Sequence, residues 1–129
     1  MTRTTLAEGE KPLHWIGSSK KDLDDLPEEV RYHMGIALGI AQFGEKSQYA
    51  KPWKGDGPGI FEVVTDYRSD TFRAVYTVRF GDVVYVLHVF QKKSKRGIKT
   101  PREHQDLVAQ RLQAARMDYE VRYANRKKD

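Results

Sequence analysis

The sequence predicts a single α+β domain, in which two N-terminal helices pack on a twisted antiparallel sheet of three or four strands and a C-terminal helix closes the fold. Three observations predict this class. Apolar residues repeat at helical spacing near both ends, β-branched and aromatic residues alternate between them, and 129 residues suffice for one core. The expected order is strand, two helices, three strands and helix, with residues 1–11 and 118–129 as flexible ends.

The N-terminal part of the chain is expected to hold one short strand and two helices. Residues 12–16 are expected to pair at the edge of the sheet, and two serines offer an N-cap for a helix over 20–26. Pro27 begins a second helix that ends at Gly44, a residue suited to the left-handed backbone after a helix. Its buried face is predicted by a helical repeat of Val30, Met34, Ala37, Leu38 and Ala41.

The predicted sheet follows a long loop. Residues 45–58 combine glycines and prolines with lysines and are expected to be irregular. A strand over 60–65, a polar turn over 66–71 and a hairpin over 72–93 come next. A closing helix begins near Thr100, and its inward stripe is Leu107, Val108, Leu112 and Ala115.

The hairpin brings the strongest candidate site residues together. With a two-residue turn at 81–82, Val75 lies opposite His88 and Arg73 opposite Phe90. Arg73 and His88 then become diagonal neighbours, roughly 7–8 Å apart at their α-carbons, and both can touch one phosphate group. Each residue alone is more often structural than catalytic, so the juxtaposition carries the hypothesis. The opposite face is expected to be the buried one and carries Phe72, Ala74, Tyr76, Val78, Tyr85, Leu87 and Val89.

Composition narrows the possible function classes. The 23 basic and 18 acidic residues leave a net charge of +5, which favours a polyanionic partner such as RNA, although a merely basic soluble protein has the same charge. The absence of cysteine excludes disulfides, thiolate metal ligands and a thiol nucleophile. No stretch approaches the ~20 apolar residues of a membrane span. We therefore expect a soluble cytoplasmic protein.

Two basic segments are candidates for nucleic-acid contact. Lys51 and Lys54 flank Trp53 in the glycine-rich loop, where cations beside an aromatic ring suit a phosphate backbone and an unstacked base. Simple solvation of these lysines is the alternative. A second segment contains no acidic residue and holds Lys92, Lys93, Lys95, Arg96, Lys99 and Arg102. The acidic residues between 22 and 29 are interpreted first as partners of the helix dipoles and second as a docking patch for a basic protein.

Five ordered segments resemble a known toxin family. They are KPLHWIGSSKKDL at 11–23, LPEEV at 26–30, KGDGPGIFEV at 54–63, DTFRAVYTV at 70–78 and VLHVFQKKSK at 86–95. In this order, within a match from about residue 11 to 117, they resemble the phage-derived HigB-like branch of the RelE/ParE toxin superfamily. The resemblance implies a RelE-like toxin domain from a type II toxin–antitoxin pair.

This resemblance also implies an activity and partners. Many members are mRNA interferases, endoribonucleases that cleave messenger RNA on the ribosome and so inhibit translation. The 2′-hydroxyl attacks the adjacent phosphate, and the reaction needs no metal or other cofactor. A cognate antitoxin, often a helix-turn-helix DNA-binding protein, neutralises the toxin in a hetero-oligomer.

Site residues are carried over one by one from the resemblance. Arg73 is expected to bind the scissile phosphate, and His88, with an ordinary pKa near 6.5, to act as acid or base. Lys51 and Lys54 are expected to assist catalysis, and Glu62 to orient Arg73 if the strands pair in the matching register. Phe90 is expected to support the site, and RNA or ribosome contacts are expected from Arg68, Trp53, Lys92, Lys93, Lys95 and Arg96.

Departures from the family pattern leave alternatives open. RelE-like enzymes often have a tyrosine acid near the C-terminus, whereas Tyr119 and Tyr123 lie beyond the predicted closing helix. Members that lose the catalytic residues bind DNA gyrase, so a ParE-like protein-binding toxin is the alternative, and an inactive antitoxin-binding module is a third possibility. For the nuclease, Arg73→Ala is expected to abolish cleavage and leave the fold intact, because Arg73 lies off the face predicted to be buried.

Overall fold

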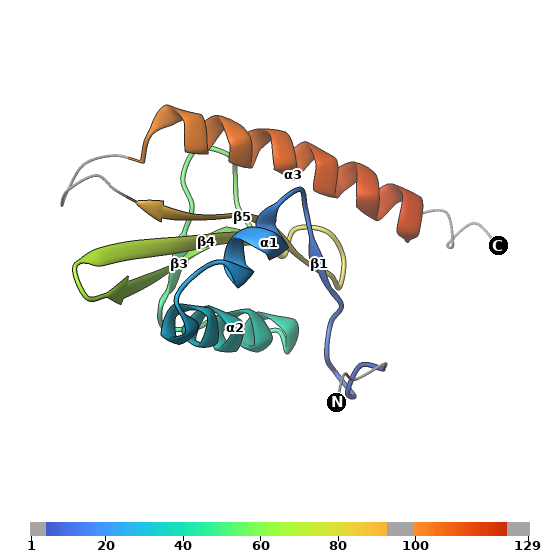
Figure 1. Cartoon of the computed structure of the whole chain (residues 1–129). Helices are drawn as coiled ribbons and strands as arrows, with labels where there is room; N and C mark the ends of the chain where they lie inside the picture. The colour runs from blue at the N-terminus through green and yellow to red at the C-terminus, as the bar shows by residue number, and fades with distance from the viewer. Residues whose placement is uncertain (1–4, 93–99, 124–129) are drawn as a thin grey trace.

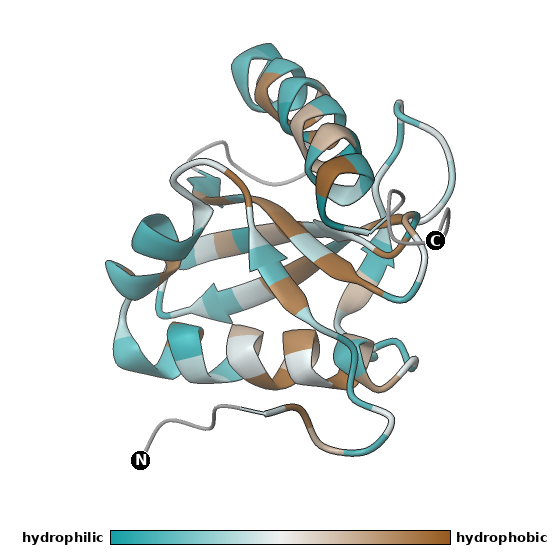
Figure 2. Ribbon diagram, turned by 90° about the vertical axis from the view of Figure 1, so that its right-hand side faces the viewer, coloured by the Kyte–Doolittle hydropathy of each residue, from teal (hydrophilic) through white to brown (hydrophobic). Residues whose placement is uncertain are grey.

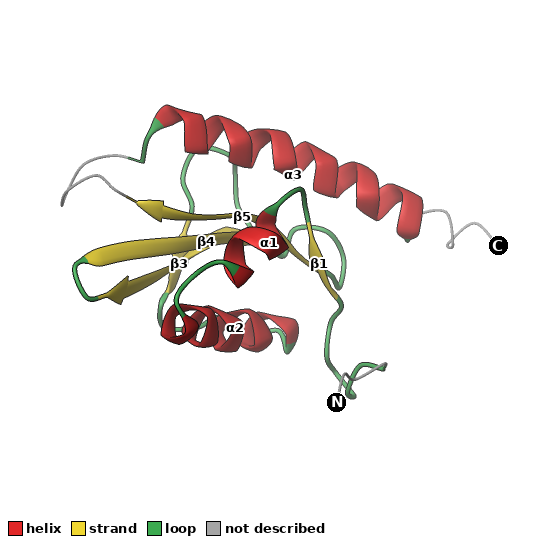
Figure 3. Cartoon of the chain, viewed as in Figure 1, coloured by secondary structure: helices red, strands yellow, loops and turns green. Residues whose placement is uncertain are grey.

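The computed structural model describes residues 5–92 and 100–123 (Figure 1). Figure 3 shows the same chain coloured by secondary structure. The elements in chain order are β1 (Leu13–Trp15), α1 (Ser19–Asp24), α2 (Glu28–Gln42), β2 (Ala50–Pro52), β3 (Ile60–Tyr67), β4 (Asp70–Thr77), β5 (Val84–Lys92) and α3 (Arg102–Arg122). The α+β class and the order of the predicted elements are confirmed, with β2 as an addition.

The described strands form one five-stranded sheet in the order β1-β5-β4-β3-β2. The strands from β2 to β5 are antiparallel, whereas β1 runs parallel to β5, with Leu13 opposite Val84. The prediction of three or four antiparallel strands was therefore wrong in two respects. β2 lies inside the predicted loop, at an edge where Pro52 costs no ladder hydrogen bond. Parallel pairing of β1 is possible because two helices and three strands intervene before β5, which a tight turn could not provide.

α2 covers one face of the sheet and α3 covers the other, whereas α1, which was predicted to pack on the sheet together with α2, lies along the β5 edge (Figure 1). The predicted α2 stripe is confirmed, since Val30, Met34, Ala37, Leu38 and Ala41 are all buried. They pack against Val63, Ala74, Tyr76 and Val86 of the sheet. Full burial of Met34 or Leu38 contributes about 1.5–3 kcal/mol each. In Figure 2 hydrophobic residues accordingly line the strands between the helical layers.

Both faces of the sheet are buried, not one as predicted. α3 packs through Val108 and Ala115 on a cluster that contains Val75, Tyr85 and Leu87. Tyr85 and Leu87 were expected on the other face. A β-bulge is the reason: Val75 lies opposite His88, but Tyr76 lies opposite Val86, so that Leu87 is an extra residue. The bulge exchanges the faces of the residues before it, so that Tyr85 and Leu87 lie on the face beneath α3, which we call the α3 face, and Val84 and Val86 lie on the opposite face.

The outer half of the hairpin and the centre of its turn agree with the prediction. Arg73 lies opposite Phe90, as expected. At the turn, the Val83 N–H donates to the Phe80 carbonyl over 3.3 Å, and Gly81 between them has a φ of 54°. A positive φ is the conformation that glycine adopts without strain. The central residues of the turn were therefore predicted correctly, but the two-residue connection was not, because β4 ends at Thr77 and β5 begins at Val84.

The C-terminal helix is longer than predicted. α3 continues to Arg122, so residues 118–122, expected within a flexible end, are helical. Two tyrosines explain the extension: the Tyr85 hydroxyl donates to Asp118 Oδ2 over 2.7 Å, and Tyr123 Oη lies 2.7 Å from His14 Nε2. Within residues 5–92 and 100–123, no helix has the length and apolar character to cross a membrane.

Candidate active site

A row of directly opposed residues crosses four strands on the α3 face. Lys51 of β2 lies opposite Glu62 of β3, Glu62 opposite Val75 of β4, and Val75 opposite His88 of β5. Directly opposed residues point to the same side of a sheet. Arg73 precedes Val75 by two residues and shares this side, because side chains alternate along a strand. The register thus brings four of the predicted site residues onto one surface.

A buried ion pair between Arg73 and Glu62 is the centre of this surface. Arg73 Nη1 donates to Glu62 Oε1, and the two side chains are only 11% and 10% exposed. The conditional prediction that Glu62 reaches Arg73 is therefore confirmed in its geometry. Arg73 Nε is buried without a hydrogen-bond partner among the described residues. An unsatisfied buried donor costs about 1–3 kcal/mol, so an oxyanion that reached Nε would relieve a real penalty.

Two lysines add positive charge around the pair. Lys51 is exposed and directly faces Glu62 across the β2–β3 ladder. Burial lowers the pKa of the Lys92 ammonium group, and the nearby Arg73 lowers it further, while Glu62 opposes the shift. Lys51, Arg73 and Lys92, which we call the cation cluster, outnumber the one carboxylate. The site therefore has the net charge that a phosphate group requires.

An open groove of about 750 Å³ runs beside the cation cluster. Lys51 and Lys54 line one side, and Thr100 and Gln105 at the start of α3 line another. Trp53 also borders the groove, but its side chain is only 5% exposed and its Nε1 donates to Asp56 Oδ2 over 3.1 Å. The indole thus belongs to the core beneath α3. The structure corrects the expectation that Trp53 is a free platform for an unstacked base.

His88 is buried between two other rings. Its imidazole stacks on Phe90 with centroids 4.7 Å apart, and its Nε2 lies 2.8 Å from His104 Nδ1. Burial first of all, and the neighbouring His104 and Arg111 in addition, lower the pKa of His88 from its ordinary value to about 4. The expectation of an ordinary pKa for His88 was therefore wrong, because α3 covers the sheet face that was predicted to be open. His88 is a neutral imidazole at physiological pH.

His104 is the site residue that the sequence interpretation missed. It is half-buried at the start of α3, and its ring stacks on Phe90 with centroids 4.1 Å apart. Burial lowers its pKa, and the neighbouring Glu103 opposes that shift. A signal was present, since His104 precedes Val108 by one helical turn and so extends the predicted inward stripe. The sequence did not show against which face of the sheet that stripe packs.

The remaining predicted residues lie elsewhere. Arg68 is exposed in the turn between β3 and β4 with a φ of 57°, and its guanidinium lies 5.1 Å from the centre of the Tyr67 ring. Lys93, Lys95 and Arg96 lie outside the described residues. In the two described ranges, no group of three histidine, aspartate or glutamate side chains is arranged to hold a metal ion.

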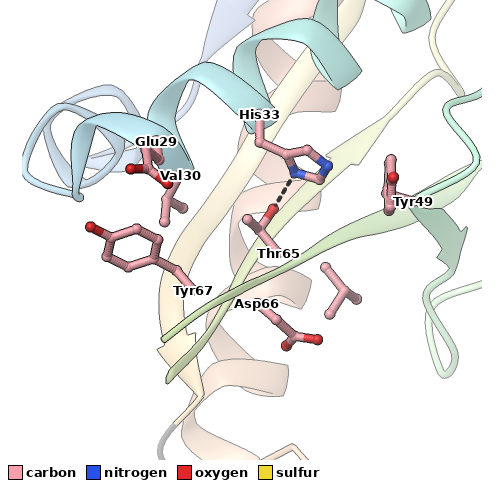
Figure 4. Close-up of a pocket in the computed structure, with 8 residues that line it drawn as sticks. Glu29, Val30, His33, Tyr49, Thr65, Asp66 and Tyr67 are labelled. Atoms are coloured by element: carbon pink, nitrogen blue, oxygen red, sulfur yellow. Dashed lines mark hydrogen bonds between the residues drawn. The ribbon is translucent and has the colours of Figure 1, made fainter. Parts of the chain in front are cut away.

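A second pocket of about 390 Å³ lies beside α2, away from the cation cluster. Its floor is a 2.6 Å hydrogen bond between His33 Nδ1 and Thr65 Oγ1 (Figure 4). Tyr49 stands at one side, 4.4 Å from the His33 ring between centroids, and Glu29 and Tyr67 stand at the other (Figure 4). The polar floor atoms satisfy each other, so this pocket lacks the unpaired donor found at Arg73.

The fold and the cation cluster define the class of protein: a small α+β protein with a cluster of positive charge on one sheet face. The family follows from the sequence. The family model described as phage-derived protein Gp49-like (DUF891) matches residues 21–113, so the chain belongs to this family. The Gp49-like family is linked to the toxins of toxin–antitoxin systems, which implies an antitoxin as partner. The matched region includes Arg73, His88 and His104. No curated protein matches the chain.

Proposed function

We propose that this protein is a HigB-like toxin that cleaves messenger RNA on the ribosome. The observation that carries the proposal is the buried Arg73–Glu62 pair beside a cationic groove. Burying an ion pair in a small domain is costly, and a merely structural role would be served as well by apolar side chains. A guanidinium held rigid by a carboxylate, with a second edge unsatisfied, is instead suited to a phosphate.

The proposed reaction uses the RNA, the protein and water. The 2′-hydroxyl gives its proton to water and attacks the adjacent phosphorus, the bond from phosphorus to the 5′-oxygen breaks, and that oxygen takes up a proton from water, which leaves a 2′,3′-cyclic phosphate and a 5′-hydroxyl. Arg73 stabilises the charge that develops on the phosphorane oxygens, and Glu62 fixes the orientation of the guanidinium. Lys51 and Lys92 add to the local field, while Lys54 in the groove grips the adjoining backbone.

The test is primer extension on a defined messenger RNA in a purified translation system, with and without ribosomes. Arg73→Lys keeps the charge beside Glu62 but removes the fork of the guanidinium, and we expect it to lose cleavage by about 10²-fold or more. A thermal melt shows whether the variant is folded. Cleavage by Arg73→Lys at the rate of the wild type would refute the role of Arg73.

A charge-matched control separates RNA contact from net charge. The double variant Lys51→Ala/Lys54→Ala removes two cations from the groove, whereas Lys20→Ala/Lys21→Ala removes two exposed cations from α1, which contributes no residue to the lining of the groove. Only Lys51→Ala/Lys54→Ala should weaken RNA binding. It should also reduce the slope of the logarithm of the binding constant against the logarithm of the salt concentration by about one to two. Equal effects of the two double variants would show that only the net charge matters.

A protein-binding toxin that inhibits DNA gyrase is the second candidate. The observation in its favour is that His88, the acid or base expected from the sequence, is buried and neutral. The gyrase candidate predicts inhibition of DNA supercoiling by the purified protein in the absence of ribosomes. RNA cleavage without supercoiling inhibition would refute this second candidate, and the reverse result would refute the nuclease.

A further inference from the structure

Two histidines and a phenylalanine form a stack that the roles proposed above do not use. His88 and His104 each stack on Phe90 with interplanar angles of 17°, and the two imidazoles are joined by the 2.8 Å contact between His88 Nε2 and His104 Nδ1. One ring comes from β5 and the other from α3. A contact of this length between two ring nitrogens requires that one nitrogen donates and the other accepts.

The direction of this hydrogen bond follows from the other nitrogen of His88. His88 Nδ1 is buried and has no hydrogen-bond partner among the described residues. Orphaned N–H donors are rarer in protein interiors than unsatisfied acceptors. His88 therefore carries its proton on Nε2 and donates it to His104, and its Nδ1 is the unpaired acceptor. Because His104 Nδ1 accepts, the proton of neutral His104 lies on Nε2, on the side of the ring away from His88.

His104 also lies next to the candidate site. Phe90, on which its ring stacks at 4.1 Å, is the direct cross-strand partner of Arg73. The following residue, Gln105, lines the groove together with Lys51 and Lys54. His104 is thus separated from Arg73 by one ring, and it is half-buried where His88 is only 5% exposed.

We propose that His104 is a catalytic residue of the nuclease: its neutral Nε2–H donates a hydrogen bond to the phosphate oxygens held by Arg73, and His88 is the positioning residue that fixes this tautomer. The inference rests on the proposed RNA cleavage. A fixed donor aimed at developing negative charge stabilises a transition state without gaining or losing a proton itself. The arrangement follows the general rule that the partner of one ring nitrogen decides what the other nitrogen does.

The charged groups around the pair favour the neutral form. His104 and Arg111 of α3 oppose a positive charge on His88, while Asp22 of α1 favours one more weakly. Glu103 favours a positive charge on His104, but burial outweighs it. Any ionisation of His104 in the pH profile of cleavage is therefore expected at a lower pH than that of an ordinary histidine.

The first experiment compares single-turnover cleavage by His104→Ala and His104→Gln. The amide nitrogen of glutamine can replace the Nε2–H donor, whereas alanine has none. We expect His104→Ala to lose about 10²-fold in rate at unchanged RNA affinity, and His104→Gln to stay within about tenfold of the wild type. Full activity of His104→Ala, or equal loss in both variants while both remain folded, would overturn the proposal. A titration near pH 7 that disappears in His104→Gln would also overturn it, because the donor would then be an imidazolium.

The second experiment does not depend on cleavage. In the wild-type protein at pH 7, ¹⁵N NMR of the imidazoles should show both His88 and His104 protonated at Nε2, and His88→Ala should release His104 into a mixture of tautomers. Protonation of His104 at Nδ1 would refute the proposed donor directly. If the wild type cleaves no RNA at all, the proposed function fails, while the NMR result still decides whether the pair has the geometry inferred here.

Discussion

Replacing Arg73 by methionine tests the ion pair at the centre of the candidate site. The substitution keeps most of the side-chain volume but leaves Glu62 as a carboxylate only 10% exposed, without its guanidinium. Breaking a buried pair in this way typically costs about 3–5 kcal/mol. We expect the lower end, about 3 kcal/mol, because Lys51 lies directly opposite Glu62 and Lys92 lies nearby. With 129 residues the unfolding entropy is about 0.27 kcal/mol/K, so the Tm should fall by about 11 °C.

The assay is calorimetry of Arg73→Met, Glu62→Met and the double variant. Replacing both partners by apolar side chains leaves no uncompensated charge. The free energy of unfolding of the double variant should therefore lie within about 1 kcal/mol of that of the wild type. The same reasoning corrects the expectation that Arg73→Ala leaves the fold untouched, since the structure buries Arg73 at 9% exposure. A Tm for Arg73→Met within 3 °C of the wild type, or simple additivity in the double variant, would refute the buried pair.

Three further predictions concern stability. The pKa of His88 is about 4 in the folded chain and near 6.5 when unfolded, so the unfolded state binds more protons between these values and stability falls as the pH is lowered through them. His88→Gln should reduce this loss by about 2 kcal/mol, and identical pH dependence in denaturant titrations would contradict the burial of a neutral ring. In urea unfolding, Gly81→Ala should lose about 2 kcal/mol more stability than Gly44→Ala. Both glycines have a positive φ, but only a Cβ at Gly81 would collide with the Tyr119 hydroxyl. Equal losses of stability would refute that contact. Trp53→Ala should destabilise by about 3–5 kcal/mol and the exposed neighbour Lys54→Ala by less than about 0.5 kcal/mol, whereas a Trp53→Ala variant of normal stability would make the indole a surface ring after all.

Local signals predicted most of the elements correctly. The α2 helix follows from one apolar stripe, and Gly44 ends it with a φ of 85° and an N–H that donates to Ala41 over 3.0 Å. The pairing of Arg73 with Phe90 follows from counting back from the turn at Gly81. Each of these predictions depends on contacts within a few residues or across one hairpin, where spacing in the sequence translates directly into position.

Features that depend on distant contacts were not predictable in the same way. Nothing in the composition near Leu87 marks a bulge, since its neighbours Val86 and Val89 suit either face of a strand sandwiched between two layers. Pro52 favoured the prediction of a loop, because proline lacks the N–H of a strand ladder. A strand is possible there only because β2 lies at the edge of the sheet. To predict that His88 is buried, one has to know that α3 packs over β5. The periodicity of apolar residues does not show which of the two apolar sheet faces α3 covers.

The parallel pairing of β1 with β5 also sets the order in which the protein can assemble as it is made. Residues 13–15 leave the ribosome early but find their strand partner only when residues 84–86 have been synthesised, which makes this one of the most non-local contacts of the fold. The candidate site draws on four strands and on the first turn of α3 in the same way. A nascent chain that stops before α3 can therefore pair all five strands but lacks the helix that covers His88 and completes the site, so whatever activity the protein has begins only after the first turns of α3 have been translated.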